Sequence, residues 1–126
     1  FNTIIIFNKQ KEMSFMLEKI YEFTKSDGKI IEKLVDDTPL LINHMVLPTG
    51  EGLPEHYSNS NVYIIIIRGI MTLTLGDQCS ANYHGGQIIN IPYKTKMNII
   101  NYQSDVLEFF VVKSPNPSVY KEYSYE

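Results

Sequence analysis

Residues 54–69 read PEHYSNSNVYIIIIRG: a polar segment that carries His56 leads into a run of apolar residues and ends at Gly69. The run, residues 62–67, contains six consecutive apolar residues, and all but one of them are β-branched. Such runs are typical of a β-strand that is buried on both faces. We therefore expect a central strand here, with His56 at the mouth of the space that the strand helps to enclose.

Strand character also appears in segments on both sides of this run. Each segment is short, rich in β-branched and aromatic residues, and bounded by clusters of Gly, Asp, Asn, Ser or Pro. Short strands at this spacing, separated by turn residues, indicate an all-β sandwich or barrel. The predicted strands are residues 29–35, 40–47, 61–67, 71–75, 87–91, 97–101 and 106–113.

A different period appears nearer the N-terminus, in residues 14–25, SFMLEKIYEFTK. Here Met16, Leu17, Ile20 and Phe23 fall on one stripe of a helix, whereas most of the charged residues fall elsewhere. We predict one short amphipathic N-terminal helix that packs on the sheet.

The chain is divided accordingly into three parts. Residues 1–28 form an N-terminal extension with the predicted helix, residues 29–113 form the barrel, and residues 114–126 form a C-terminal tail. Residues 1–12 have two interpretations: a segment upstream of the native start, or a short strand that pairs with a sheet edge.

Composition excludes several functional classes. The chain has 126 residues, 44% of them hydrophobic, which suits one domain with a single core. The net charge is −3 without a basic cluster, so we expect no nucleic-acid partner. No apolar stretch reaches the roughly 20 residues of a membrane helix, so we expect no membrane partner. One cysteine, Cys79, cannot form an internal disulfide, and we expect a cytoplasmic location.

Two glycine-bounded segments resemble the sequence motifs of the cupin family. The second cupin motif is matched at Gly86, Pro92 and Asn101 with every spacing kept, and the first is matched at His56 and Gly69. The chain thus resembles a small, single-domain, RmlC-like cupin. The resemblance implies an all-β fold, the double-stranded β-helix or jelly-roll barrel.

The resemblance also identifies the positions at which cupins hold a metal, and this chain departs from them. Metal-binding cupins use two histidines and a glutamate from the first motif and a histidine from the second. Those positions are occupied here by His56, Ser58, Val62 and Met97. Serine is a poor ligand for first-row metals, valine cannot ligate, and methionine prefers soft ions such as Cu(I). We expect no metal or other cofactor; the alternative is a divalent metal or copper bound by His56, His44 and Met97.

By the family's geometry, one face of the central strand looks into the barrel and forms a ligand pocket. A pocket walled by Ile, Val and Met with one histidine at its mouth suits a small apolar or aromatic ligand. The alternative is a barrel filled by side chains, without a cavity. His44 joins this pocket if its face of the strand points inward. The predicted pocket residues are His44, His56, Ser58, Val62, Ile64, Met97 and Ile99.

The opposite face of the central strand carries Tyr63, Ile65 and Ile67. Three large apolar residues in a row are seldom left exposed on a monomer. The predicted helix or a second subunit could cover them, and small cupins are commonly dimers. We predict a homodimer.

Three functions remain open. The first is a metal-independent module that binds a small molecule in the apolar pocket. The second is a cupin-type isomerase, epimerase or dioxygenase-like enzyme with His56 as general acid or base. The third is an interaction domain in which the barrel is filled. Metal-free cupin epimerases pair a histidine with a carboxylate, and no Asp or Glu is obviously placed to orient His56, which favours the binding module.

Overall fold

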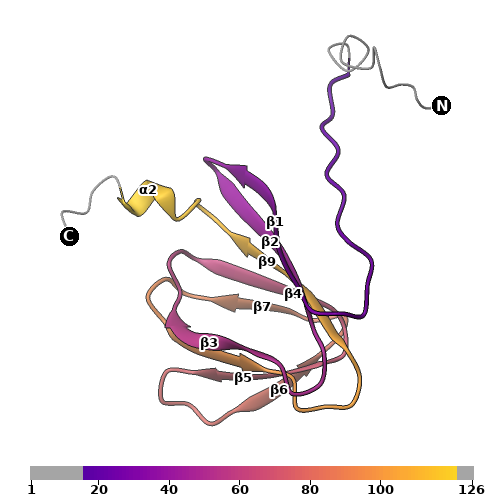
Figure 1. The fold of residues 1–126 in the computed structure, drawn as a ribbon. Coiled ribbons are helices and arrows are strands. Elements are labelled where there is room, and N and C mark those ends of the chain that lie inside the picture. Colours follow the sequence, from indigo (N-terminus) through magenta and orange to yellow (C-terminus); the bar gives the residue numbers. More distant parts are fainter. Residues whose placement is uncertain (1–15, 122–126) are drawn as a thin grey trace.

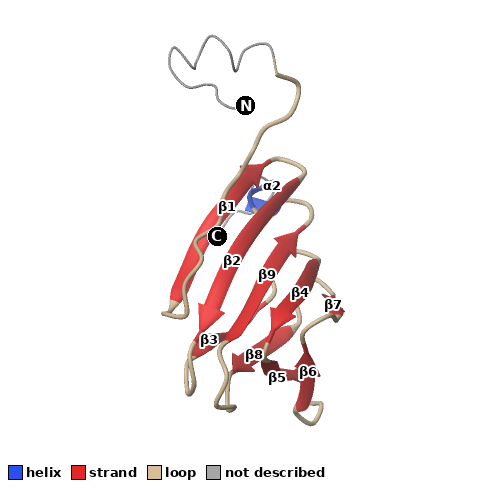
Figure 2. Cartoon of the chain, turned by 90° about the vertical axis from the view of Figure 1, so that its right-hand side faces the viewer, coloured by secondary structure: helices blue, strands red, loops and turns tan. Residues whose placement is uncertain are grey.

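In a computed structural model, which describes residues 16–121, the chain folds into two antiparallel sheets that face each other (Figures 1 and 2). The five-stranded sheet has the order β1-β2-β9-β4-β7, and the four-stranded sheet has the order β3-β8-β5-β6. Within the described residues, no helix is long and apolar enough to cross a membrane. The elements are β1 (Ile30–Asp37), β2 (Leu40–Leu47), β3 (Gly52–Tyr57), β4 (Val62–Arg68), β5 (Ile70–Leu75), β6 (Ala81–His84), β7 (Ile88–Ile91), β8 (Lys96–Ile100), β9 (Leu107–Lys113) and the short helix α2 (Ser118–Lys121).

The chain passes from one sheet to the other at Gly69, between β4 and β5. Gly69 has a φ of 89°, which side-chain-bearing residues rarely adopt. A Cβ atom at this position would also lie 2.3 Å from the carbonyl oxygen of Val106. Only glycine fits such a turn, which explains why the apolar run of β4 ends where it does.

The seven predicted strands are all present, with their ends shifted by a few residues at most, and two further strands were missed. Both missed strands, β3 and β6, lie at the edges of the four-stranded sheet. β3 contains Pro54, which cannot donate a ladder hydrogen bond and lies where the register with β8 shifts. β6 is short and largely polar, as edge strands often are. Neither has the apolar alternation from which a strand is predicted.

The central strand β4 is buried on its inner face only. Val62, Ile64 and Ile66 point between the sheets into the core and are almost fully buried. On the outer face, 41% of Tyr63 and 49% of Ile67 are exposed. The expectation of burial on both faces is therefore wrong for the single chain: the alternation of side chains holds, but residues 16–121 leave the outer face partly uncovered.

The predicted N-terminal helix is not formed in the described part of its range, residues 16–25, which is extended and comes to lie against the five-stranded sheet at Phe23 and Thr24 (Figure 1). The apolar residues Leu17 and Ile20 of the predicted stripe are exposed. An isolated helix of about 12 residues is marginal in water, so packing decides the conformation. The extended chain places Phe23 on the rings of His44 and Phe110, 4.8 and 5.0 Å away between centroids.

The end of the chain is attached to the barrel through Asn116. Its amide donates to Asp36 Oδ1 (2.7 Å) and to the carbonyl of Asp37 (3.0 Å), at the end of β1. In α2, Tyr120 stacks on Tyr93, with ring centroids 4.2 Å apart. These contacts hold the segment after β9 against the same end of the barrel as the β1–β2 turn.

A charged cluster, buried at His44 and Glu108 and more exposed at its other members, joins the N-terminal segment to the outer face of the five-stranded sheet. His44 is fully buried; its Nδ1 lies 2.7 Å from Glu32 and its Nε2 lies 2.6 Å from Glu108. Ionised carboxylates only accept hydrogen bonds, so this arrangement offers each ring nitrogen of His44 an acceptor. Arg68 Nε donates to Glu108 (2.8 Å), while its Nη2 lies 2.9 Å from Asp27.

The cluster alters the ionisation of its carboxylates. Burial by itself would raise the pKa of Glu108, but hydrogen bonds from His44 and Arg68 and their positive charges outweigh burial and lower it. The pKa of Glu32 is lowered first by the backbone N–H of Thr24 and then by His44. The folded state therefore holds both carboxylates ionised more strongly than the unfolded chain does.

We predict that Glu108→Gln lowers the free energy of unfolding by about 2 kcal/mol at pH 7, because His44 and Arg68 lose a buried partner. A lowered folded-state pKa adds stability above the ordinary value of 4.5, and this stability is lost as the pH falls through the folded-state value. Urea unfolding between pH 7 and pH 3 should therefore show a shallower acid loss in the variant than in wild type. The exposed Glu55→Gln is the control, and equal acid slopes for wild type and Glu108→Gln would contradict the prediction.

Candidate functional site

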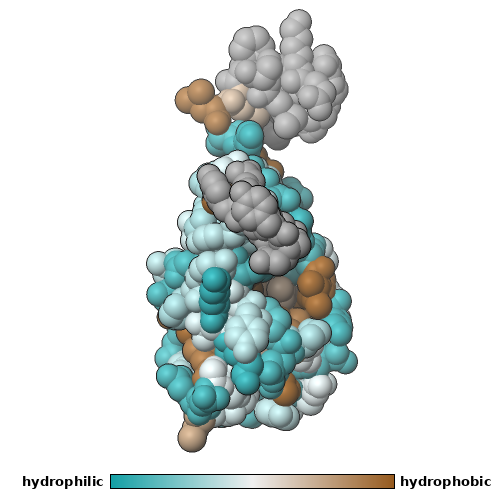
Figure 3. All heavy atoms as spheres, turned by 90° about the vertical axis from the view of Figure 1, so that its left-hand side faces the viewer, coloured by the Kyte–Doolittle hydropathy of each residue, from teal (hydrophilic) through white to brown (hydrophobic). Residues whose placement is uncertain are grey.

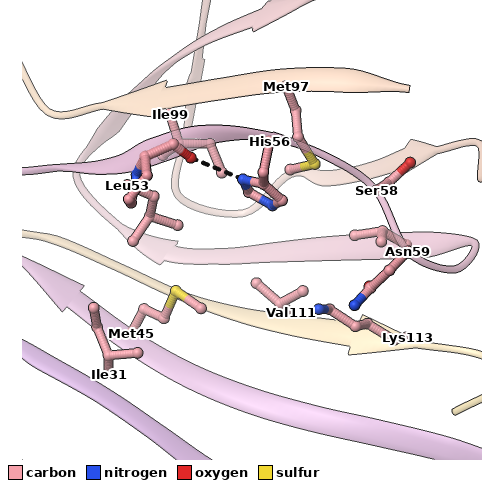
Figure 4. A pocket seen from close by; sticks show the side chains of 12 residues that line it. Ile31, Met45, Leu53, His56, Ser58, Asn59, Met97, Ile99, Val111 and Lys113 are labelled. Atoms are coloured by element: carbon pink, nitrogen blue, oxygen red, sulfur yellow. Dashed lines mark hydrogen bonds between the residues drawn. The ribbon is translucent and has the colours of Figure 1, made fainter. Parts of the chain in front are cut away.

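A half-enclosed cavity of about 360 Å³ lies between the two sheets. Its wall is mostly apolar, with Asn59 and Lys113 side by side at one end and His56 beside Met97 on the opposite sheet (Figure 4). Strands of both sheets contribute, so the cavity is part of the barrel interior and not a surface groove. The lining residues are Ile31, Met45, Leu53, Pro54, His56, Ser58, Asn59, Val62, Met97, Ile99, Val111 and Lys113.

Five of the seven residues predicted for the pocket line this cavity: His56, Ser58, Val62, Met97 and Ile99. The other two do not. Ile64 is buried deeper in the core, where other side chains fill the space between the sheets.

The expectation that His44 might face inward is wrong, because Met45 takes the inward position on β2. His44 instead lies on the outer face of that sheet, bound to Glu32 and Glu108. A site shared by His44 and His56 is therefore not formed. The choice depended on which face of β2 points inward, and alternation along one strand does not reveal that.

His56 reaches the cavity because of an irregularity in β3. Leu53 pairs with Ile99, and His56 pairs with Met97, so three steps along β3 match two along β8. This bulge at Pro54 and Glu55 brings the imidazole to the cavity, while Glu55 lies outside it.

The imidazole of His56 is oriented by its own backbone. Nδ1 lies 2.8 Å from the carbonyl oxygen of Pro54, drawn as the dashed line in Figure 4, and therefore carries the proton that it donates. The other nitrogen, Nε2, has no hydrogen-bond partner among the described residues. This nitrogen is available to hydrogen-bond a ligand in the cavity.

Ser58 is buried and serves the structure of the barrel. Its hydroxyl donates to the carbonyl of Pro92 (2.6 Å) and accepts from the backbone N–H of Thr95 (2.8 Å). The backbone N–H of Ser58 also donates to the carbonyl of Thr95 at 2.8 Å. These bonds join the end of β3 to the loop before β8 and leave the hydroxyl fully engaged.

The four positions at which cupins hold a metal do not fit one in this chain. The imidazole of His56 is one donor, the hydroxyl of Ser58 is committed to backbone partners, and Val62 offers none. Met97 adds only a soft thioether. In residues 16–121 no group of three or more His, Cys, Asp or Glu side chains could hold a metal ion. The alternative set of His56, His44 and Met97 is wrong, because His44 lies on the other face of its sheet.

Sequence reasoning missed two polar residues of the cavity, Asn59 and Lys113 (Figure 4). Lys113 ends β9 and continues the inward alternation of Phe109 and Val111. The sequence shows that alternation, but a lysine at the end of a predicted strand is ordinarily expected to be exposed to solvent. Burial first, and then the positive charge of Lys33, lower the pKa of Lys113.

Known proteins that are similar to this chain have the same fold. No model of a protein family matches the chain. An uncharacterised protein of Methanocaldococcus jannaschii is 55% identical over 103 residues, which cover 81% of this chain and 89% of that protein. The crystal structure of an RmlC-like cupin family protein with a double-stranded β-helix fold, from the same organism, has a TM-score of 0.81 at 53% identity, covering 84% of this chain and 98% of its own.

A second structure shares the fold at a much lower sequence identity. A cupin superfamily protein from Desulfitobacterium hafniense has a TM-score of 0.63 at 13% identity, over 74% of this chain and 83% of its own, and shares the fold alone. The relationship to the M. jannaschii protein is much nearer in sequence and spans nearly all of that protein. On this identity and coverage, the chain belongs to the RmlC-like cupin family.

Proposed function

We propose that the protein is a metal-independent module that binds a small molecule in the cavity between its sheets. The observation that carries this proposal is an apolar cavity of about 360 Å³ to which a few polar side chains converge. Ligand pockets typically have volumes of about 300–1,000 Å³ with mostly apolar walls and few polar groups. The cavity lies near the lower limit, which favours a small ligand with an apolar or aromatic body.

The lining residues favour binding over catalysis. Acid–base enzymes commonly orient a histidine with a carboxylate, which also supports its protonated form. The ring of His56 is oriented by a neutral carbonyl, and no Asp or Glu lines the cavity in the described part of the chain. An isomerase, epimerase or dioxygenase-like activity based on His56 therefore has less support than a role as a hydrogen-bond acceptor for the ligand.

We also propose that the protein is a homodimer that pairs through the outer face of its five-stranded sheet. Support comes from Tyr63 and Ile67 on β4 and from Ile88 on β7, which are large, apolar and exposed side by side on neighbouring strands. On the side shown in Figure 3, by contrast, apolar surface appears as small separate patches among hydrophilic residues. An exposed apolar face of this kind is typical of an interface.

A cytoplasmic location completes the proposal. The single cysteine, Cys79, is exposed in the β5–β6 loop as a free thiol. An exposed free thiol is typical of proteins in a reducing compartment, where thiols stay reduced.

Filling the cavity should abolish binding. We predict that Val111→Phe, which projects a larger ring into the cavity, prevents binding of benzyl alcohol, measured as chemical-shift changes of cavity residues in NMR titrations. Val112→Phe, on the outer face next to it, is the matched control and should bind as wild type does. If wild type shows no shifts at cavity residues, or if Val111→Phe binds equally well, the barrel does not work as a ligand site.

Metal content tests the metal-independent part of the proposal. Untagged protein purified without chelator should contain iron, manganese, zinc and copper well below one equivalent, in both wild type and His56→Ala. The reason is that His56 alone among the four cupin positions offers an uncommitted nitrogen donor. Near-stoichiometric metal in wild type, lost in His56→Ala, would instead reveal a site built around this imidazole.

Light scattering tests the dimer. We predict a mass of twice the chain mass of 14.5 kDa for wild type, and a shift toward monomer in Ile67→Lys, which places a charge on the apolar outer face. Tyr57→Lys changes an exposed aromatic of the other sheet and should leave the mass unchanged. A wild-type mass near 14.5 kDa would contradict a dimer.

A further inference from the structure

Lys113 lies where the apolar cavity meets a polar groove. It lines the cavity together with Val111, and it also lines a neighbouring groove with Lys33, Asp36 and Asn116. The side chain is half-buried, although it carries a charge and ends an otherwise apolar strand. Its ammonium is therefore held at the boundary of the cavity, partly removed from water.

The charge of Lys113 is not neutralised by its surroundings. Within residues 16–121 its ammonium makes no ion pair. The carboxylate of the groove, Asp36, already binds Lys33 Nζ (3.3 Å) and the amide of Asn116 (2.7 Å). Burial and the charge of Lys33 both disfavour the ammonium form and lower the pKa of Lys113. A partly buried cation without a partner is stabilised by an anion.

Other polar groups of the cavity complement this charge. Asn59 projects toward the same region as the Lys113 side chain, and its amide can donate a hydrogen bond (Figure 4). His56 faces the cavity from the opposite sheet. Next to these groups the wall is made of methyl, methylene and thioether groups from Met45 and Met97. The cavity thus has one cationic, donor-bearing part and one apolar part.

We propose that the ligand is a small organic carboxylate: its anionic end binds Lys113, with Asn59 as a second donor, and its apolar body lies between Met45, Val62 and Met97. This inference rests on the proposed function, because it names the class of ligand that the cavity takes. A monocarboxylate matches the Lys113 ammonium and the Asn59 amide better than a phosphate does, because the nearby Lys33 is already bonded to Asp36 and a doubly charged group would leave charge unpaired in a half-buried site.

The test compares acids with their neutral amides of the same shape. Hexanoate and hexanamide, and benzoate and benzamide, are titrated into the full chain at pH 7 and followed by NMR. Wild type should bind each carboxylate about ten-fold more tightly than its amide, because only the acid makes a charge-assisted hydrogen bond with the Lys113 ammonium. Lys113→Met should reduce carboxylate binding to the level of the amide, while its amide binding stays at the wild-type level.

Two variants control for charge and folding. Lys94→Met removes the same charge outside the cavity and should keep the ten-fold preference. Lys113→Arg keeps a cation at the site and should retain most of it. Unchanged amide binding in Lys113→Met shows that its cavity is intact.

The outcomes separate the two proposals. Equal binding of acids and amides by wild type would overturn the carboxylate inference and leave the binding cavity standing. A preference for acids that survives in Lys113→Met would overturn the role of Lys113. Absence of binding by all four probes would overturn the ligand cavity itself, and the inference with it.

Discussion

The alternation of side chains along β2, β9 and β4 is the constraint on which the rest of the structure depends. Successive residues of a strand point to opposite faces, so a shift by one residue would exchange the two faces completely. On β2 the alternation sends Met45 into the cavity and His44 to the outer face. On β9 it sends Val111 and Lys113 inward and Glu108 outward, where Glu108 binds His44 and Arg68. An apolar cavity and a buried ionic cluster thus lie on opposite faces of one sheet.

This constraint explains which parts of the structure could be read from the sequence. Strands with β-branched runs, such as β4, are identified by composition alone, and the cupin motifs supply the order in which they wrap. β3 and β6 were missed because β3 contains Pro54 and β6 is largely polar, so neither has the apolar alternation of a strand. The helical period near Phe23 was misleading, because the contacts of this residue with His44 and Phe110 are made by an extended chain and come from far along the sequence.

The apolar residues of the cavity could be predicted from the sequence, whereas its charged residue could not. Val62, Met97 and Ile99 follow from alternation and from the family's geometry. The face of His44 was left open, because the inward face of β2 depends on how β2 pairs within its sheet, and the sequence of one strand does not give that pairing. Lys113 was missed because its half-burial depends on the groove formed with β1 and the residues before α2. Sequence patterns do not predict the burial or partners of a residue whose neighbours come from distant parts of the chain.

The bulge in β3 determines which of two neighbouring side chains, Glu55 or His56, faces the interior. Regular pairing continued from Leu53 and Ile99 would place Glu55, and not His56, opposite Met97. The interior would then present a carboxylate in place of an imidazole. β3 is an edge strand, so such a change of register would disturb one neighbouring strand and leave the core of the other sheet untouched. The register of one edge strand therefore decides whether an imidazole or a carboxylate faces the interior at this position.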